Sequence, residues 1–151
     1  MHNRILATTI GLAAALGLAG CPDPEAPKTR VTLDQGPSLH GTDNNNDGLR
    51  DDVEAAIDAM SGTDDEKAFL RLSARITEQA LDLTTDREAA RSHARREDLQ
   101  LFCNDLGVDY PELFEEVEIA DAFVLNTDER RAAYDAYDSL LSGGDFALPN
   151  C

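Results

Sequence analysis

The sequence predicts an all-α fold, a small bundle of four to five helices within one domain that spans residues 43–151. Apolar residues recur at intervals of three and four positions through much of residues 53–141, which is the spacing of helices with one buried face. Capping pairs, in which Thr or Asn is followed three positions later by Glu, divide this stretch into segments of helical length. The alternating runs that are typical of strands are missing, and β-branched residues are sparse. A chain of this length can bury a core.

Residues 1–20 have the pattern of a bacterial export signal. Arg4 supplies a positive start, and residues 5–19 form an apolar stretch that is shorter than the about 20 residues of a membrane-spanning helix. The stretch ends in Leu18-Ala19-Gly20-Cys21, which resembles the lipobox of bacterial lipoproteins. That resemblance implies cleavage before Cys21 and lipidation of Cys21, palmitate included. A soluble secretory signal with a Cys at this position by chance is the alternative.

Residues 21–42 are expected to be the lipidated Cys followed by a flexible linker. Four of the six prolines lie between Pro22 and Pro37, among polar residues. This composition is typical of an extended tether, which would hold the folded domain away from the membrane surface.

Residues 43–54 fit the spacing D-x-[DN]-x-[DN]-G-x₅-E at every specified position. This run resembles the EF-hand calcium loop, in which a hard cation takes about six to eight oxygen ligands from one short turn. Gly48 stands where such a loop turns sharply. An acidic turn without an ion is the alternative, because Asp and Asn also favour turns and helix caps. The resemblance implies one Ca²⁺ ion held by Asp43, Asn45, Asp47, the Leu49 carbonyl, Asp51 and Glu54.

The surroundings of this loop differ from those of a paired EF-hand. Residues 36–42 contain one Pro and two Gly and predict no entering helix, whereas the residues after Glu54 predict an exit helix. A loop with only an exit helix resembles the half-hands of dockerins and other extracellular calcium-loop proteins. Arg50 occupies the eighth position, where paired loops usually carry an aliphatic residue, so we expect no partner loop.

The helices after the loop are delimited by caps and breakers. The first has Val53, Ala56, Ile57 and Met60 on one face. The expected bounds of the others are Thr63–Glu66 to Leu83, Thr85–Glu88 to about Leu106, Pro111 to about Leu125, and Asn126–Glu129 to Gly143-Gly144.

The chain contains three cysteines. If Cys21 carries lipid, Cys103 and Cys151 remain as a pair in an oxidising compartment, and we expect a disulfide between them. It would close a loop of roughly 49 residues and stabilise the fold by about 4 kcal/mol. Two free thiols are the alternative.

The net charge is strongly negative, −17 for the whole chain and −18 once Arg4 is removed with residues 1–20. Nucleic acid is therefore disfavoured as a partner, because its recognition depends on neutralising phosphates. Electrostatic attachment to anionic lipid is disfavoured for the same reason.

We expect no catalytic residues. The sequence has no nucleophile elbow, no H-E-x-x-H motif and no phosphate-binding glycine loop. A metal-assisted hydrolase that uses the loop carboxylates is an alternative. Arg87, Arg91 and Arg95 share one helix face that we interpret as solvated, with an anion or acidic-partner site as the alternative. His40 and His93 have no second His or Cys at metal-ligand spacing.

Three further stretches extend the lipoprotein resemblance. Residues 46–54, 126–134 and 141–144 are similar to a group of uncharacterised proteobacterial lipoproteins. Together with the lipobox, the resemblance implies a non-enzymatic, lipid-anchored cell-envelope protein with one structural calcium ion. We favour the outer membrane over the inner membrane, with the domain facing the periplasm or the cell surface. The alternative is an acidic interaction module, such as an immunity, inhibitor or assembly lipoprotein, that captures a basic protein partner of unknown identity.

Overall fold

Helix α2, Asp64–Ala80, is the element against which the other helices pack. It begins at a capping box, in which Thr63 Oγ1 accepts from the Glu66 amide and Glu66 Oε2 accepts from the Thr63 amide. This is the start that the sequence predicts. One face of α2 buries Phe69, Leu70 and Ala74, and the helix contacts α1, α3, α4 and α5.

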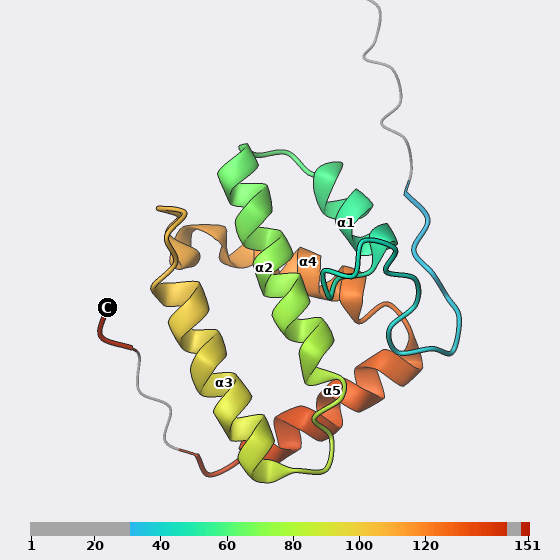
Figure 1. Cartoon of the computed structure of the whole chain (residues 1–151), viewed down its shortest axis with the longest axis vertical. Helices are drawn as coiled ribbons and strands as arrows, with labels where there is room; N and C mark the ends of the chain where they lie inside the picture. Colours follow the sequence, from blue (N-terminus) through green and yellow to red (C-terminus); the bar gives the residue numbers. More distant parts are fainter. Residues whose placement is uncertain (1–30, 145–148) are drawn as a thin grey trace, which may run out of the picture.

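The computed structural model describes residues 31–144 and 149–151 (Figure 1). Within these residues the chain forms helices and no strand, which confirms the all-α fold class. The predicted signal peptide at residues 1–20, Cys21 and the first part of the predicted linker lie outside the described residues. The elements in chain order are α1 Asp51–Asp58, α2, α3 Arg87–Phe102, the 3₁₀ helix η1 Tyr110–Leu113, α4 Phe114–Val124 and α5 Asp128–Leu141.

The main core lies where α1, α2 and α4 meet, and α3 completes it through Leu101. In Figure 1, α2 runs through the middle of the domain, with α3 on one side, α1 on the other and α4 passing behind it. A smaller cluster of Ala80, Ala90 and Tyr137 joins α2 to α3 and α5. The fully buried apolar side chains of the main core include Leu49, Val53, Ile57, Phe69, Ala74, Ala120 and Val124.

Several helix boundaries differ from the predicted ones, among them the end of α2 at Ala80 instead of Leu83 and the start of α4 at Phe114 instead of Pro111. The cap of α3 is Asp86, not Thr85, because Asp86 Oδ1 accepts from the amides of Glu88 and Ala89. The cap of α5 is Thr127, not Asn126, and Thr127 Oγ1 accepts from the Arg130 amide at 3.3 Å.

Helix α3 ends at Phe102 rather than near Leu106. The Asn104 side-chain amide donates to the carbonyls of Leu101 and Val108, each at 2.9 Å, and its oxygen accepts from the Leu106 amide at 3.1 Å. A short polar side chain that bonds nearby backbone in this way competes with continuation of the helix.

Residues 31–42, the described part of the predicted linker, contain no helix and lie against the folded domain. Leu33 and Leu39 pack on the main core. Asp34 receives the Asn126 side-chain amide on its carbonyl at 2.8 Å, and its own amide donates to Asp52.

The predicted disulfide is confirmed, since Cys103 and Cys151 are bonded with their Cα atoms 5.5 Å apart. The bond attaches Cys151 to Cys103, the residue that directly follows the last turn of α3.

No helix among residues 31–144 and 149–151 has both the length and the apolar character needed to cross a bilayer.

Reduction of the Cys103–Cys151 bond, or Cys151→Ser, should lower the melting temperature. The reason is that the denatured chain regains conformational entropy once two residues 48 positions apart are no longer cross-linked. The loss in unfolding free energy should be at most about 4 kcal/mol. Thermal denaturation followed by circular dichroism, with and without reductant, measures the change, and Asn150→Ser is the matched control. Labelling of both Cys103 and Cys151 by alkylation of folded, unreduced protein, read by intact mass, would contradict the bond.

Candidate functional site

The loop before α1 turns at the position that its sequence predicts. Gly48 has φ +87° and Asn46 has φ 55°, so both residues take the left-handed conformation. Gly adopts this conformation without steric cost, and Asn is one of the few other residues that tolerate it. The positive φ at position 48 therefore explains why Gly stands there.

Three side chains of the loop bond back to its own backbone. Asp43 Oδ2 accepts from the Gly48 amide at 2.9 Å, and Asn45 Oδ1 accepts from the Asp47 amide at 3.1 Å. Asp47 Oδ1 accepts from the Leu49 amide at 3.0 Å. The bonds to Asn45 and Asp47 are Asx turns, and the bond to Asp43 closes the loop over five positions.

The other predicted ligands lie at the start of α1. Asp51 accepts from the Asn44 backbone amide at 3.0 Å and from the Asn44 side chain. Glu54 Oε2 accepts from the Asn45 side-chain amide at 3.3 Å, so these two predicted ligands contact each other. The Leu49 side chain is fully buried in the main core, which fixes the position of its backbone.

The predicted ligands have the right chemistry for calcium, because all six donors are hard oxygens. Their side-chain oxygens are engaged mainly with N–H donors, as described above. Among residues 31–144 and 149–151, no group of three or more His, Cys, Asp or Glu side chains is gathered in a way that could hold a metal ion. A calcium ion would thus require Asp51 and Glu54 to exchange these hydrogen bonds for the ion.

Two arginines of α2 also reach this loop. Arg75 donates to Asp47 Oδ2 at 2.8 Å, and Arg71 Nε lies 3.9 Å from Glu54 Oε1. Arg71 also pairs with Asp58 of α1. No local pattern in the sequence indicates these contacts, because α2 and the loop are separate segments.

Arg50, at the eighth position of the loop, points into the protein and its side chain is fully buried. It donates to the carbonyls of Val124 and Phe123 at 3.1 and 3.0 Å, and to Asn126 Oδ1 at 3.2 Å. These carbonyls belong to the last turn of α4, which has no further helical amides to bond them. The residue that marked a departure from paired EF-hands therefore attaches the loop to α4.

Arg130 of α5 is the second fully buried arginine. It donates to the carbonyls of Leu39, Asp34 and Ser38 at 3.0, 2.8 and 2.8 Å. A hydrogen bond from the Gly36 amide and another from Arg130 lower the pKa of the Asp34 carboxyl.

Glu78 of α2 is 4% exposed and lies next to Arg50, whose Nη1 is 3.8 Å from Glu78 Oε2. Burial raises the pKa of Glu78, although Arg50 and His40 oppose the shift. His40 lies 3.5 Å from Glu78 of α2 and 2.8 Å from Asp82, which lies in the turn after α2, so it contacts two carboxylates.

Two of the three arginines on the α3 face hydrogen-bond to the segment after α5. Arg87 and Arg91 both donate to the carbonyl of Ser142 just after α5, at 3.4 and 2.9 Å. His93 is buried against Tyr137, 3.1 Å from its hydroxyl, and burial lowers the pKa of His93.

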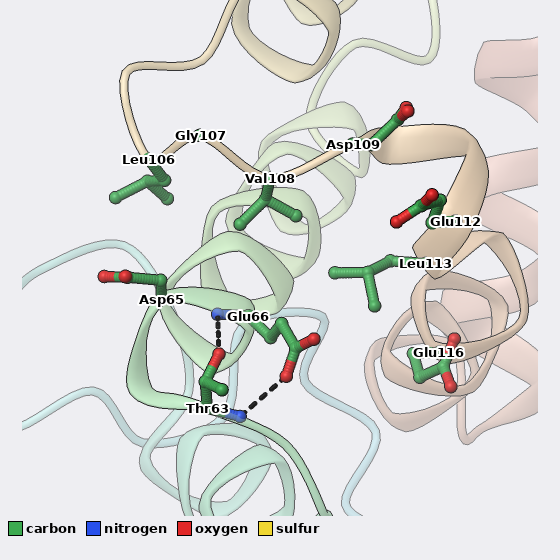
Figure 2. Close-up of a pocket in the computed structure, with 10 residues that line it drawn as sticks. All are labelled: Thr63, Asp65, Glu66, Leu106, Gly107, Val108, Asp109, Glu112, Leu113 and Glu116. Carbon is green, nitrogen blue, oxygen red and sulfur yellow. Dashed lines mark hydrogen bonds between the residues drawn. The ribbon is translucent and has the colours of Figure 1, made fainter.

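A cavity of about 470 Å³ lies between the start of α2, the α3–η1 connection and the start of α4 (Figure 2). Figure 2 shows Val108 and Leu113 within it, beside the capping box of α2. Its lining residues include no Lys or Arg. The carboxylates around it belong to Asp65, Glu66, Asp109, Glu112 and Glu116.

Two partly buried carboxyls, one on α3 and one on α4, have raised pKa values. Burial, helped by the charges of Asp121 and Asp98, raises the pKa of Glu97 from 4.5 to about 7. Burial raises the pKa of Asp121 from 3.8 to about 6, although Thr77 Oγ1 donates to Asp121 Oδ1 at 2.8 Å and opposes the shift. Sequence patterns could not show this, because the shift depends on how α2, α3 and α4 pack.

Comparison with protein-family models, with curated proteins and with solved structures gives no match to this chain. The function has to be argued from its own residues.

Neutralising Glu97 should stabilise the protein at alkaline pH. Its folded pKa of about 7 lies above the ordinary value of 4.5, so the native state binds more protons than the unfolded state between these values. The contribution of Glu97 to stability is fully present below about pH 4.5 and is lost as the pH rises through about 7. Glu97→Gln should raise the unfolding free energy by about 1–2 kcal/mol at pH 8 and change it little at pH 5.

Urea denaturation at both pH values measures this difference, and Asp138→Asn, at an exposed position of α5, is the control. An equal effect of Glu97→Gln at pH 5 and pH 8 would show that the pKa of Glu97 is not raised.

Proposed function

We propose that this protein is a non-enzymatic, lipid-anchored cell-envelope protein whose loop 43–54 binds one structural calcium ion. The observation that carries the calcium proposal is the turn of residues 43–49, in which Asp43, Asn45 and Asp47 each accept a loop amide and Gly48 has positive φ. Three oxygen-bearing side chains thus come from alternate positions of one short turn, and this spacing supports an ion that takes its ligands from a short segment.

Electrostatics also support a cation at this place. Asp43, Asp47, Asp51 and Glu54 put four carboxylates into twelve residues of a chain whose net charge is −17. Repulsion between these carboxylates opposes the folded loop, and a divalent cation among them would reverse that effect.

A structural role for the ion is supported by the position of the loop between the core and the first turn of α1. The side chains of Leu49, Arg50 and Val53 lie among the predicted ligands and are buried, so the loop and the core share one segment of chain. Asp51 and Glu54 belong to the first turn of α1, and an ion joining them to Asp43 would hold this helix start in place. Calcium would thereby stabilise the attachment of the loop to the core.

The lipid anchor is proposed from the lipobox at Leu18–Cys21 and the proline-rich composition of residues 22–37. On this proposal Cys21 carries the lipid and the folded domain lies on the outer or periplasmic side of a membrane, with the outer membrane favoured. The disulfide between Cys103 and Cys151 is consistent with an oxidising compartment.

Isothermal titration of the full-length protein with calcium should show uptake of one ion, with a Kd of about 10⁻⁴–10⁻³ M, the range of extracellular calcium modules. The double variant Asp43→Ala, Glu54→Ala should abolish this uptake and the accompanying rise in melting temperature. The control variant Glu129→Ala, Asp138→Ala removes the same charge from exposed positions of α5 and should bind normally. Unchanged uptake in the Asp43, Glu54 variant would show that loop 43–54 is not the site.

The acidic cavity of Figure 2 favours a second candidate function, capture of a basic protein partner. Five carboxylate residues and no Lys or Arg line about 470 Å³ of space, and Val108 and Leu113 offer apolar contact for the stem of a Lys or Arg side chain. If the protein captures a basic partner in this way, the calcium loop would only support the fold.

A lysine- and arginine-rich peptide should bind the full-length protein with an affinity that falls steeply between 50 and 300 mM salt, as expected for charge-driven association. The variant Glu112→Gln, Glu116→Gln should weaken binding by about tenfold, and Glu129→Gln, Asp138→Asn should change it little. Fluorescence anisotropy measures both. Equal binding by the two variants would show that net charge alone, and not this cavity, attracts the peptide.

A further inference from the structure

Arg75 extends from the middle of α2 to the predicted calcium loop. A Cβ atom at Gly48 would lie 3.6 Å from Arg75 Cγ and 3.7 Å from its Cδ, so the side-chain stem lies against the sharpest turn of the loop. The guanidinium then donates to Asp47 Oδ2 at 2.8 Å. The side chains of Arg75 and Asp47 are 28% and 32% exposed, so the pair is partly shielded from water.

Arg75 donates to the carboxylate oxygen of Asp47 that does not bond the loop backbone. Asp47 Oδ1 accepts from the Leu49 amide at 3.0 Å, and Oδ2 holds Arg75. One turn earlier on α2, Arg71 Nε lies 3.9 Å from Glu54 Oε1. Two residues from the predicted ligand set therefore face arginines spaced four positions apart.

These ion pairs leave one donor of each arginine, its Nε, without a hydrogen-bond partner among the described residues. In Arg71 and Arg75 alike this atom is buried. A buried donor without a partner opposes the arrangement, so part of the gain from the ion pairs is lost. An alternative partner for the loop carboxylates could replace these arginines at a reduced cost.

We propose that Arg75 competes with calcium for Asp47 and thereby sets how tightly loop 43–54 binds the ion. This inference rests on the proposed calcium site. A carboxylate oxygen that accepts from a guanidinium is less available to a cation, and two cations on one carboxylate would lie close enough to repel each other. Binding of calcium would then release the Arg75 guanidinium from the loop, which gives the site a lower affinity than its ligand set alone would have.

Calcium titration of the full-length protein and of Arg75→Gln, by calorimetry, tests the competition. Arg75→Gln should tighten calcium binding by roughly fivefold, the effect of losing one partly exposed ion pair. It should also lower the melting temperature in chelator and enlarge the rise in melting temperature that calcium causes. Arg75→Lys retains a charged side chain over Gly48 and should fall between the wild type and Arg75→Gln.

Arg95→Gln is the matched control, because it removes the same charge from α3, where Arg95 lies 3.8 Å from Glu88. Its calcium affinity should stay within about twofold of the wild type, since its partner Glu88 is not in the loop. Uptake by Arg75→Gln together with no measurable uptake by the wild type would support the competition strongly.

Equal affinities of Arg75→Gln and Arg95→Gln, with clear uptake by the wild type, would overturn the competition and leave the calcium site standing. Absence of uptake in the wild type, Arg75→Gln and Arg75→Lys alike would overturn the calcium site and the competition together.

Discussion

Two buried arginines hold the irregular segments of this protein to its helices, and they meet at one side chain. Arg50 and Arg130 both donate to Asn126 Oδ1, at 3.2 and 2.6 Å. Arg50 comes from the loop before α1 and Arg130 from α5, while Asn126 lies in the short connection between α4 and α5. Residues 31–42, the loop and the end of α4 are thus held together by hydrogen bonds around a common centre.

The chemistry of these arginines explains why they can be buried. A guanidinium loses much hydration on burial and needs partners for all its donors. Here most of those partners are backbone carbonyls that helices do not use, such as the carbonyl of Val124 at the end of α4 and that of Ser38 before the loop. Asp34, Asp52 and Glu78 supply the nearby negative charge. Removing either guanidinium would leave several buried carbonyls without donors, so the arrangement depends on both.

The same segment of chain carries the proposed calcium site and the attachment to the core. Between Asp47 and Glu54 the predicted ligands share one stretch of backbone with the buried residues Leu49, Arg50 and Val53. Arg75 adds a contact from α2 to the outer side of this segment. The acidic cavity lies at the far end of α2, beside Thr63, and shares none of these residues. The two candidate functions therefore depend on separate parts of the domain and can be tested separately.

The sequence by itself determined the features that depend on residues close together in the chain. The capping box of Thr63 and Glu66, the turn at Gly48 and the helical class of the domain follow from interactions over three to five positions, which a local pattern records. The Cys103–Cys151 bond was predictable because few cysteines were available to pair. Tertiary structure alone decided the distant partners of Arg50 and Arg130, which lie up to 76 and up to 96 positions away. Those partners are mainly backbone carbonyls, which every residue has, so no residue type marks them in the sequence. The contact of Arg75 with Asp47 and the raised pKa of Glu97 were equally hidden, because both arise only when segments that are separate in the sequence come together.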